Sequence, residues 1–413
     1  MMTSLFGFLR RNWQIAVSSP AGPPKTGDAL KFGLLGAANI APMAFLTPAK
    51  HHPEVIVQAV AARDKKKATD FAKKHGIPQV FGSYDELLDD PSIDAVYIPL
   101  PNGLHFEWAM KALAKGKHVL VEKPAVSNAT EAALLFRSPH LKGPNARFIL
   151  EAFHYRFQPS WLHFMSLIDQ PNIAHVKVVM NIAAALIPKD DIRFRYDLAG
   201  GAMMDLTYTM SVLRAVYGAE PTECTACEVA TMPPPNDLCD YKYRGTWRFP
   251  NGGTGEMVAS LQSSIREFLS PMMPAIVTHK PVVVADDTLP PGQEKVRTRT
   301  VTLHNFTVGA LWHRIDVVDE FEIREAGAVV KKWTTTEHRK AYTLREAGIG
   351  LPSETYWLSY KHQLDAFVDR IRGRRGTGAW IDPEDSINQA RMIDMAYAKA
   401  GLPLRPTSKY AAT

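Results

Sequence analysis

Cysteine is scarce in this sequence, which has three, Cys224, Cys227 and Cys239, among 413 residues. Three cysteines cannot build the disulfide framework of a small secreted protein. Cys224 and Cys227 have the CxxC spacing of some redox and zinc sites, but a zinc site needs four ligands and usually a second close pair. The residues around them are typical of a strand. We therefore expect ordinary reduced thiols and no metal site.

Long apolar runs and an excess of one charge are also missing. No apolar run approaches the roughly 18 residues that cross a bilayer, so the sequence predicts no membrane span. The 48 basic and 42 acidic side chains leave a net charge of only +6. The one basic cluster is residues 65–67, which argues against nucleic acid as a partner. The length and the 46% hydrophobic content predict a globular protein of at least two domains.

Acidic side chains are absent before Asp28. In this stretch the apolar residues 5–9 precede Arg10 and Arg11, the reverse of the order in a secretory signal. Two interpretations remain: a mitochondrial presequence, or an arm that packs on its own domain or on a partner subunit. We expect a cytoplasmic protein, with mitochondrial import as the alternative.

From residue 31 onward, strand-like segments alternate with helix-like segments. The strand candidates are residues 31–35, 55–61, 94–98 and 118–122. Ser83 and Glu86 form a capping box that begins one of the intervening helices. Repeated units of this length predict a parallel sheet with helices on both faces, which is a doubly wound Rossmann domain.

The first of these strands ends in a turn rich in glycine and alanine, residues 36–41. This turn is a degenerate form of the GxGxxG motif, with Ala38 and Ala41 at the second and third glycine positions. Gly36 can make the tight turn, and small side chains let the backbone approach a pyrophosphate at a helix N-terminus. Alone the motif is weak, because such corners also occur without a ligand. The residues expected to contact a cofactor here are Gly36, Ala38, Asn39 and Ile40.

The end of the second strand distinguishes the two nicotinamide cofactors. An acidic residue there accepts from the ribose 2′-hydroxyl of NAD, whereas an arginine accommodates the 2′-phosphate of NADP. Arg63 occupies this place, and Asp64 is one position further. The alternative is that both residues simply begin a solvated helix. The sequence predicts NADP(H) in preference to NAD(H).

Polar residues also follow the next two strands. Ligands of such sheets bind beyond the carboxyl ends of the strands. Lys123 follows residues 118–122, and Asn102 and His105 follow residues 94–98. A lysine that faces the cofactor can donate or accept a substrate proton, and an oxidised nicotinamide would favour its neutral form. The alternative for an isolated lysine is simple solvation.

Three segments, residues 33–41, 97–105 and 116–124, occur in an order and spacing that resemble the Gfo/Idh/MocA oxidoreductase family. The similarity is greatest to its dihydrodiol and D-xylose dehydrogenase branch, and Glu-Lys-Pro at 122–124 is the most specific signature. Residues 151–157 also resemble the family segment just after the Rossmann domain. The resemblance covers residues 30 to 215 well and the C-terminal half more loosely.

The resemblance implies roles for individual residues. Lys123 is implied to be the catalytic or substrate-orienting lysine, and Glu122 is implied to support the cofactor. Asn102 and His105 would lie beside the nicotinamide ribose and the substrate. Tyr155 and Arg156 would line the substrate pocket.

Residues 200–208 resemble the second catalytic segment of the family, with one departure. The family pattern has an Asp, a Gly two residues later and a His or Tyr four residues later. Here Asp205 is followed by Thr207 and Thr209 at those places, with Tyr208 between them. A helix turns by about 100° per residue, so Tyr208 need not face the same way as the family residue. We expect Asp205 to accept from a substrate hydroxyl and Tyr208 to donate a proton; alternatively, Asp205 caps a helix and Tyr208 packs.

The pattern changes after Gln158. Alternating segments predict an α+β domain with a large, mostly antiparallel open sheet, one face of which covers the substrate. The resemblance implies a homodimer through the other face. The predicted division is an N-terminal arm or targeting segment at 1–28, the Rossmann domain at 29–151, the substrate and dimerisation domain at 152–380, and a C-terminal helix and tail at 381–413.

Together these features predict an NADP(H)-dependent oxidoreductase. It would transfer hydride between the nicotinamide and a hydroxyl-bearing carbon of a sugar, cyclitol or trans-dihydrodiol. Lys123 would manage the hydroxyl proton, with help from Tyr208. Two alternatives stay open: a cofactor-binding regulator without turnover, and a non-redox glycosidase or epimerase that keeps its NAD(P).

Overall fold

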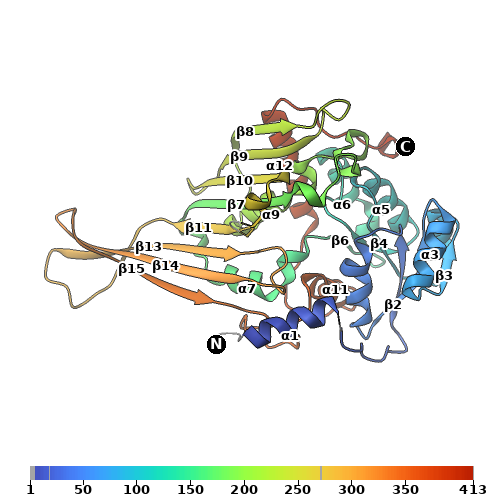
Figure 1. Cartoon of the computed structure of the whole chain (residues 1–413), viewed down its shortest axis with the longest axis horizontal. Coiled ribbons are helices and arrows are strands. Elements are labelled where there is room, and N and C mark those ends of the chain that lie inside the picture. Colours follow the sequence, from blue (N-terminus) through green and yellow to red (C-terminus); the bar gives the residue numbers. More distant parts are fainter. Residues whose placement is uncertain (1–4, 18, 270–271, 413) are drawn as a thin grey trace.

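The computed structural model describes residues 5–17, 19–269 and 272–412. Residues 1–4 of the predicted N-terminal arm lie outside the described residues. Figure 1 shows a smaller sheet flanked by helices on one side of the molecule and a larger sheet that extends away on the other.

The smaller sheet is the predicted Rossmann domain. Its six strands are all parallel, in the order β3-β2-β1-β4-β5-β6. The strands are β1 (Leu30–Leu35), β2 (Val55–Ala61), β3 (Gln79–Phe81), β4 (Ala95–Ile98), β5 (His118–Val121) and β6 (Ile149–Glu151). The helices between them include α2 (Thr47–Lys50), α3 (Lys65–His75), α4 (Tyr84–Asp89), α5 (His105–Ala114) and α6 (Ala129–Phe136). The predicted doubly wound fold is confirmed.

The central strands of this sheet are apolar because helices cover both of their faces. Every residue of β4 is buried, and only the first residue of β5 is partly exposed. Helix α5 buries Phe106, Ala109 and Leu113. Buried parallel strands of this kind leave their carboxyl ends as the place where polar side chains can gather.

The larger sheet has nine strands, in the order β15-β14-β13-β11-β7-β10-β9-β8, with β12 paired to β13. Only β7 and β10 run parallel, so the expected mostly antiparallel sheet is confirmed. The strands are β7 (Ile173–Ala183), β8 (Glu223–Thr231), β9 (Asp240–Arg248), β10 (Thr254–Ser263), β11 (Ala275–His279), β12 (Val282–Val284), β13 (Gln293–His304), β14 (Arg314–Glu325) and β15 (Ala328–Arg339). The ends of β13, β14 and β15 reach far beyond the body (Figure 1).

Helices at both ends of the chain connect the two domains. The N-terminal helix α1 (Leu5–Ala16) packs on the second domain, where the buried Arg11 donates from Nε to the Ala310 carbonyl at 2.7 Å. Its guanidinium lies 3.6 Å from the centre of the Tyr342 ring. Near the other end, α11 (Ser359–Ile371) packs on α2, and α12 (Pro383–Lys399) packs on α6. The described part of the N-terminal arm therefore packs on the body of its own chain.

A search of the described residues finds no helix with the length and apolar character needed to cross a bilayer. It also finds no group of three or more potential metal-binding side chains in these residues. Cys224 and Cys227 lie on β8 as free thiols, and burial raises their pKa values to about 11 and about 12. Both thiols therefore stay protonated at neutral pH.

Candidate active site

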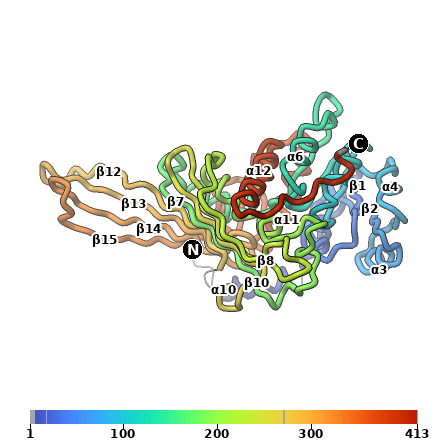
Figure 2. Tube along the Cα trace, turned by 90° about the horizontal axis from the view of Figure 1, so that it is seen from above, coloured from blue at the N-terminus to red at the C-terminus, as the bar shows by residue number. Residues whose placement is uncertain are grey.

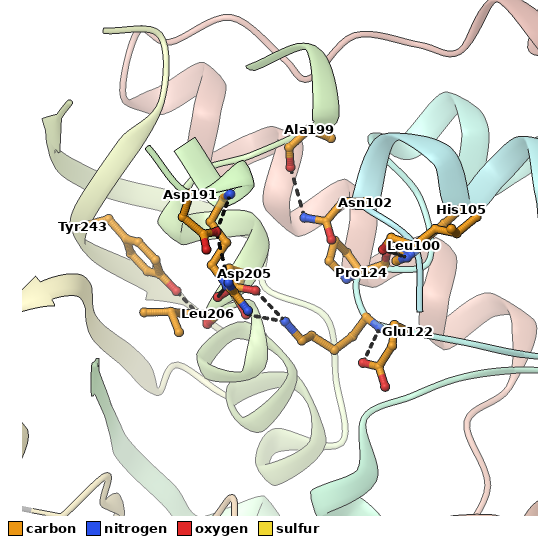
Figure 3. Close-up of polar contacts among 12 residues, drawn as sticks. Leu100, Asn102, His105, Glu122, Pro124, Asp191, Ala199, Asp205, Leu206 and Tyr243 are labelled. Atoms are coloured by element: carbon orange, nitrogen blue, oxygen red, sulfur yellow. Dashed lines mark hydrogen bonds and ion pairs between the residues drawn. The ribbon is translucent and has the colours of Figure 1, made fainter. Parts of the chain in front are cut away.

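Lys123 and Asp205 meet where the two domains face each other. Lys123 follows β5 directly, and Asp205 ends the short helix α8 (Ala202–Asp205) of the second domain. The Lys123 ammonium donates to the Asp205 carbonyl at 2.8 Å and to its Oδ1 at 2.9 Å (Figure 3). Their side chains are 13% and 18% exposed, so both remain within reach of a small molecule.

Arg193 extends this ion pair, and reasoning from the sequence did not identify it. Its Nε donates to Asp205 Oδ2 at 3.0 Å, and its Nη1 lies 3.0 Å from Asp191 Oδ1. Burial opposes ionisation of Asp205, but Lys123 and Arg193 outweigh it, so the pKa of this carboxyl is lowered. Asp205 is therefore a carboxylate at neutral pH. The available signal was the run of charged residues 189–197 just before the glycine pair.

Tyr208, the proton donor predicted from the sequence, is the first residue of α9 (Tyr208–Tyr217) and lies beside Lys123. The centre of its ring lies 5.3 Å from Lys123 Nζ, and its ring packs edge to face on Phe153. Burial, reinforced by neighbouring Tyr360 and Glu122, raises the pKa of Tyr208 well above its ordinary value. None of the hydrogen bonds found among the described residues involves its hydroxyl. The group is thus a protonated donor without a fixed partner.

The two threonines that flank Tyr208 face the interior. Thr209 is fully buried, and its hydroxyl hydrogen-bonds the Tyr243 hydroxyl at 2.6 Å. Thr207 is also buried and accepts from Gln389 at 2.6 Å. The residue at the family's His or Tyr position therefore points away from Lys123, whereas Tyr208 lies beside it.

His105 contacts the loop that follows β5 and carries Lys123. It is fully buried, with Nδ1 2.7 Å from the Pro124 carbonyl and Nε2 2.7 Å from the Leu100 carbonyl. Burial lowers the pKa of His105 to about 4, although the two carbonyl oxygens favour the protonated ring. Both ring nitrogens face backbone oxygens in this structure, and the expected contact of His105 with cofactor and substrate stays a prediction. His105 instead links the loop after β4 to the one that carries Lys123 (Figure 3).

Glu122 and Asn102 are also engaged around this centre. Glu122 accepts from the Tyr97 hydroxyl at 2.7 Å, and burial raises the pKa of its carboxyl despite the nearby Lys123 ammonium. Asn102 donates from Nδ2 to the Ala199 carbonyl at 3.1 Å, which joins the first domain to the segment before α8. Their cofactor contacts stay predictions.

The Tyr155 ring lies 6.0 Å from the ring of Tyr208, whereas Arg156 pairs away from Lys123. Tyr155 is fully buried, and its hydroxyl hydrogen-bonds Ser211 at 2.9 Å. Arg156 pairs with Asp385 on α12, which also pairs with Arg214. Each polar group has a partner inside the protein, and the expectation that both residues line the substrate pocket stays a prediction.

The loop after β1 has the form that a dinucleotide requires. Gly36 has a φ of +119°, a conformation that favours glycine, and a Cβ there would lie 3.1 Å from Leu100. The three following residues that were expected to contact a cofactor, Ala38, Asn39 and Ile40, are all at least partly exposed. A backbone loop that is accessible and turns this tightly can approach a pyrophosphate.

Arg63 lies at the end of β2 with its side chain exposed. No ion pair of its guanidinium occurs within the described part of the chain. Asp64, in contrast, accepts from the Lys67 N–H at 3.1 Å and caps α3. The acid next to Arg63 is therefore committed to the helix, and the arginine is left available for an anionic group.

Glu151 supports the lysine loop from the adjacent strand and carries a testable pH dependence. Its Oε1 accepts from the Ala125 N–H at 3.0 Å, and burial raises the pKa of Glu151 from 4.5 to about 7. The folded protein then binds more protons than the unfolded chain between these pH values, so this residue lowers stability as the pH rises through that window.

Glu151→Gln is expected to increase the free energy of unfolding relative to the wild type, and more at pH 8 than at pH 5. Glutamine cannot ionise, and its amide oxygen can still accept from Ala125. The gain should differ by about 2 kcal/mol between the two pH values. Urea unfolding at both pH values measures it, with the exposed Glu228→Gln as the control. An equal effect of Glu151→Gln at both pH values would contradict the prediction.

Comparisons with known proteins identify the family of the chain. Residues 30–140 match a family model described as an oxidoreductase family with an NAD-binding Rossmann fold. The chain is 36% identical over 242 residues to D-xylose 1-dehydrogenase (NADP(+)) 2 of Haloferax volcanii, covering 57% of this chain and 70% of that protein. It is 34% identical over 200 residues to trans-1,2-dihydrobenzene-1,2-diol dehydrogenase of Xenopus tropicalis, covering 47% and 59%.

Solved structures extend the likeness to the second domain. The 3-ketoreductase KijD10 from Actinomadura kijaniata, in complex with NADP and TDP-benzene, superimposes with a TM-score of 0.63 at 21% identity. The match covers 90% of this chain and 98% of that chain. At this identity the likeness concerns the fold, and it includes both sheets.

Proposed function

Since the chain belongs to the Gfo/Idh/MocA family of NAD(P)-dependent oxidoreductases, we propose that it transfers hydride between NADP(H) and a hydroxyl-bearing carbon of a sugar, cyclitol or trans-dihydrodiol. The observation that carries this proposal is the pairing of Lys123 with Asp205 across the domain boundary. It supports the proposal because the Lys123 ammonium, which can give up a proton, and the Asp205 carboxylate, which can accept a hydrogen bond, lie at the carboxyl ends of the parallel strands.

The cofactor-binding part of the proposal rests on residues of the first domain. Gly36, Ala38, Asn39 and Ile40 would hold the pyrophosphate, and Arg63 would bind the 2′-phosphate. Asn102, Glu122 and Lys123 would lie near the nicotinamide end. When bound there, the cofactor would serve as the hydride donor or acceptor of the reaction.

The proton chemistry falls to three side chains. During reduction, the Lys123 ammonium would give a proton to the forming hydroxyl oxygen, and during oxidation the neutral Lys123 amine would take the hydroxyl proton back. Tyr208, which is protonated and beside Lys123, would donate a hydrogen bond to the same oxygen. Asp205 would hold the ammonium in place and accept from a neighbouring substrate hydroxyl. A substrate with adjacent hydroxyl groups suits this arrangement of one cation, one anion and one phenol.

The test is a titration of the purified protein with NADPH and with NADH, followed by turnover assays. The substrate panel contains D-xylose, trans-1,2-dihydrobenzene-1,2-diol and a cyclitol, each with NADP⁺. We expect tight NADPH binding, weaker NADH binding and NADPH formation from at least one substrate. Binding without turnover would favour a regulator, and a cofactor that co-purifies without exchange would favour a non-redox reaction. No binding of either cofactor would refute the proposal.

Three further expectations stand beside this proposal. We propose that the domains of the chain end at residues 28, 151 and 380. We also keep the homodimer through the open sheet and the cytoplasmic location as predictions. Size-exclusion chromatography with light scattering tests the dimer directly.

A further inference from the structure

A buried ion pair between Arg405 and Asp240 lies outside the cluster described above. Both side chains are completely buried, and Arg405 Nη2 lies 2.9 Å from Asp240 Oδ1. The Tyr397 ring packs 4.0 Å from the guanidinium, and its hydroxyl donates to the same carboxylate oxygen at 3.0 Å. Desolvating two charges costs about as much as their attraction returns, so stability alone does not explain the pair.

The pair holds the turn that leads into α8. Arg405 Nε donates to the Gly200 carbonyl, and Asp240 Oδ2 accepts from the Met203 N–H at 2.7 Å. Between these contacts, Gly201 has a φ of +126°. A Cβ at Gly201 would lie 2.3 Å from Asp240 Oδ1 and 2.5 Å from Arg405 Nη2. The glycine is thus required both for the backbone conformation and for the close approach of the ion pair.

This turn fixes Asp205. The Asp205 N–H donates to the Gly201 carbonyl at 2.9 Å. This hydrogen bond ties Asp205 to the turn that Arg405 and Asp240 hold. The Asp205 carboxylate and carbonyl then both accept from Lys123. A displacement of the turn would therefore move both acceptors of the lysine together.

The segment that carries Arg405 also contacts the first domain. Asn128 Nδ2, at the start of α6, donates to the Arg405 carbonyl at 3.0 Å and to Thr407 Oγ1 at 2.9 Å. The Ser408 N–H donates to Glu131 Oε1 at 2.6 Å. Figure 2 shows this C-terminal segment, in dark red, running from α12 back towards α6. The segment therefore contacts the first domain, which carries Lys123, and the second domain, which carries Asp205.

We propose that residues 402–408 form a strap, and that Arg405 and Asp240 are positioning residues that hold Asp205 opposite Lys123. The strap sets the position of the second domain's acceptors relative to the first domain's lysine. This inference rests on the proposed function, because it assigns the strap a part in the proton transfer at that site.

The test compares Arg405→Met/Asp240→Asn with Asp205→Asn and with the variant that combines all three changes. Removing both charges avoids a lone buried charge, and asparagine can still accept one of the hydrogen bonds to Asp240. The matched control is Arg391→Met/Glu384→Gln, which removes an exposed ion pair on α12. The assay uses NADP⁺ with D-xylose and with trans-1,2-dihydrobenzene-1,2-diol, and thermal unfolding confirms folding.

We expect the pair variant to lose kcat by roughly 10- to 100-fold, since misplacement by about 1 Å can cost that much. The NADP⁺ dissociation constant should change by less than about 3-fold, because the loop after β1 is untouched. Adding Asp205→Asn to the pair variant should cost little more, since both changes act through one contact. Wild-type kcat in the pair variant, or losses that multiply, would overturn the inference.

Hydrogen exchange of residues 200–206 separates this outcome from failure of the proposed function. If the wild type turns over neither of these substrates nor the cyclitol of the panel, the proposed function fails. The strap is then judged on amide exchange alone, which should become faster at the Met203 N–H in the pair variant than in the control. Unchanged protection at Met203 would reject the strap whatever the turnover.

Discussion

Lys123→Met should lower kcat by roughly 10²- to 10⁴-fold, the range that a positioned acid or base contributes. Methionine fills a similar space, and Asp205 keeps Arg193 as a charged partner at 3.0 Å, so the variant should still fold. The substitution leaves Gly36 and Arg63, which are predicted to contact the cofactor, unchanged. We therefore expect the NADPH dissociation constant to stay within about 3-fold of the wild type, whereas turnover nearly disappears.

The control for this prediction is Lys115→Met. Lys115 is half-exposed and pairs with Asp89 on the surface, so its loss should leave turnover unchanged. Steady-state kinetics and NADPH fluorescence titration on both variants give the comparison. If Lys123→Met kept wild-type kcat while it bound cofactor, another group would have to manage the proton, and the mechanism would be wrong.

Arg63→Ser should weaken NADPH binding by roughly 10- to 100-fold and leave NADH binding almost unchanged. A charge-assisted contact to a phosphate contributes about 1.5 to 3 kcal/mol, which corresponds to this range. Asp64 cannot take over, because its carboxylate caps α3 and would repel the 2′-phosphate. The ratio of the NADPH and NADH dissociation constants, measured by nicotinamide fluorescence, is the readout.

Lys66→Ser provides the matched control for Arg63. Lys66 lies three residues away, is also exposed, and pairs with Asp70 at 2.9 Å. Because its charge is already paired, its removal should change the ratio by less than about 2-fold. Equal losses in the two variants would mean that the general positive charge of this region, and not Arg63, selects NADP(H).

The Rossmann domain could be predicted from the sequence because its signals are local. Each strand is a short apolar run, and the helix after β3 begins with a capping box in which Ser83 accepts from the Glu86 N–H at 3.1 Å. The turn after β1 requires a positive φ at Gly36, and glycine adopts this conformation readily. A glycine at the end of an apolar run therefore predicts such a turn. Lys123 could also be predicted, since the end of a parallel strand is a fixed place in such a sheet.

Individual contacts could not be predicted in the same way. The sequence leaves open whether Tyr208 or Thr209 faces the lysine, because one position turns a helical side chain by about 100°. His105, Tyr155 and Arg156 look like site residues in the sequence, yet their polar atoms meet the loop carbonyls, Ser211 and Asp385 inside the protein. A sequence pattern places a residue on an element but does not say which partner its side chain finds.

By itself, the sequence determined the fold class, the glycine turn after β1 and the place of Lys123 after β5, because these depend on short-range periodicity and backbone geometry. Only the tertiary structure decided that Arg193 donates a hydrogen bond to Asp205. It also decided that Arg405 donates to the carbonyl of Gly200, which is 205 residues earlier in the chain. Such contacts depend on how two domains and a C-terminal segment pack together. Burying a charge is costly unless it is paired, and no local pattern in the sequence records which partner it finds.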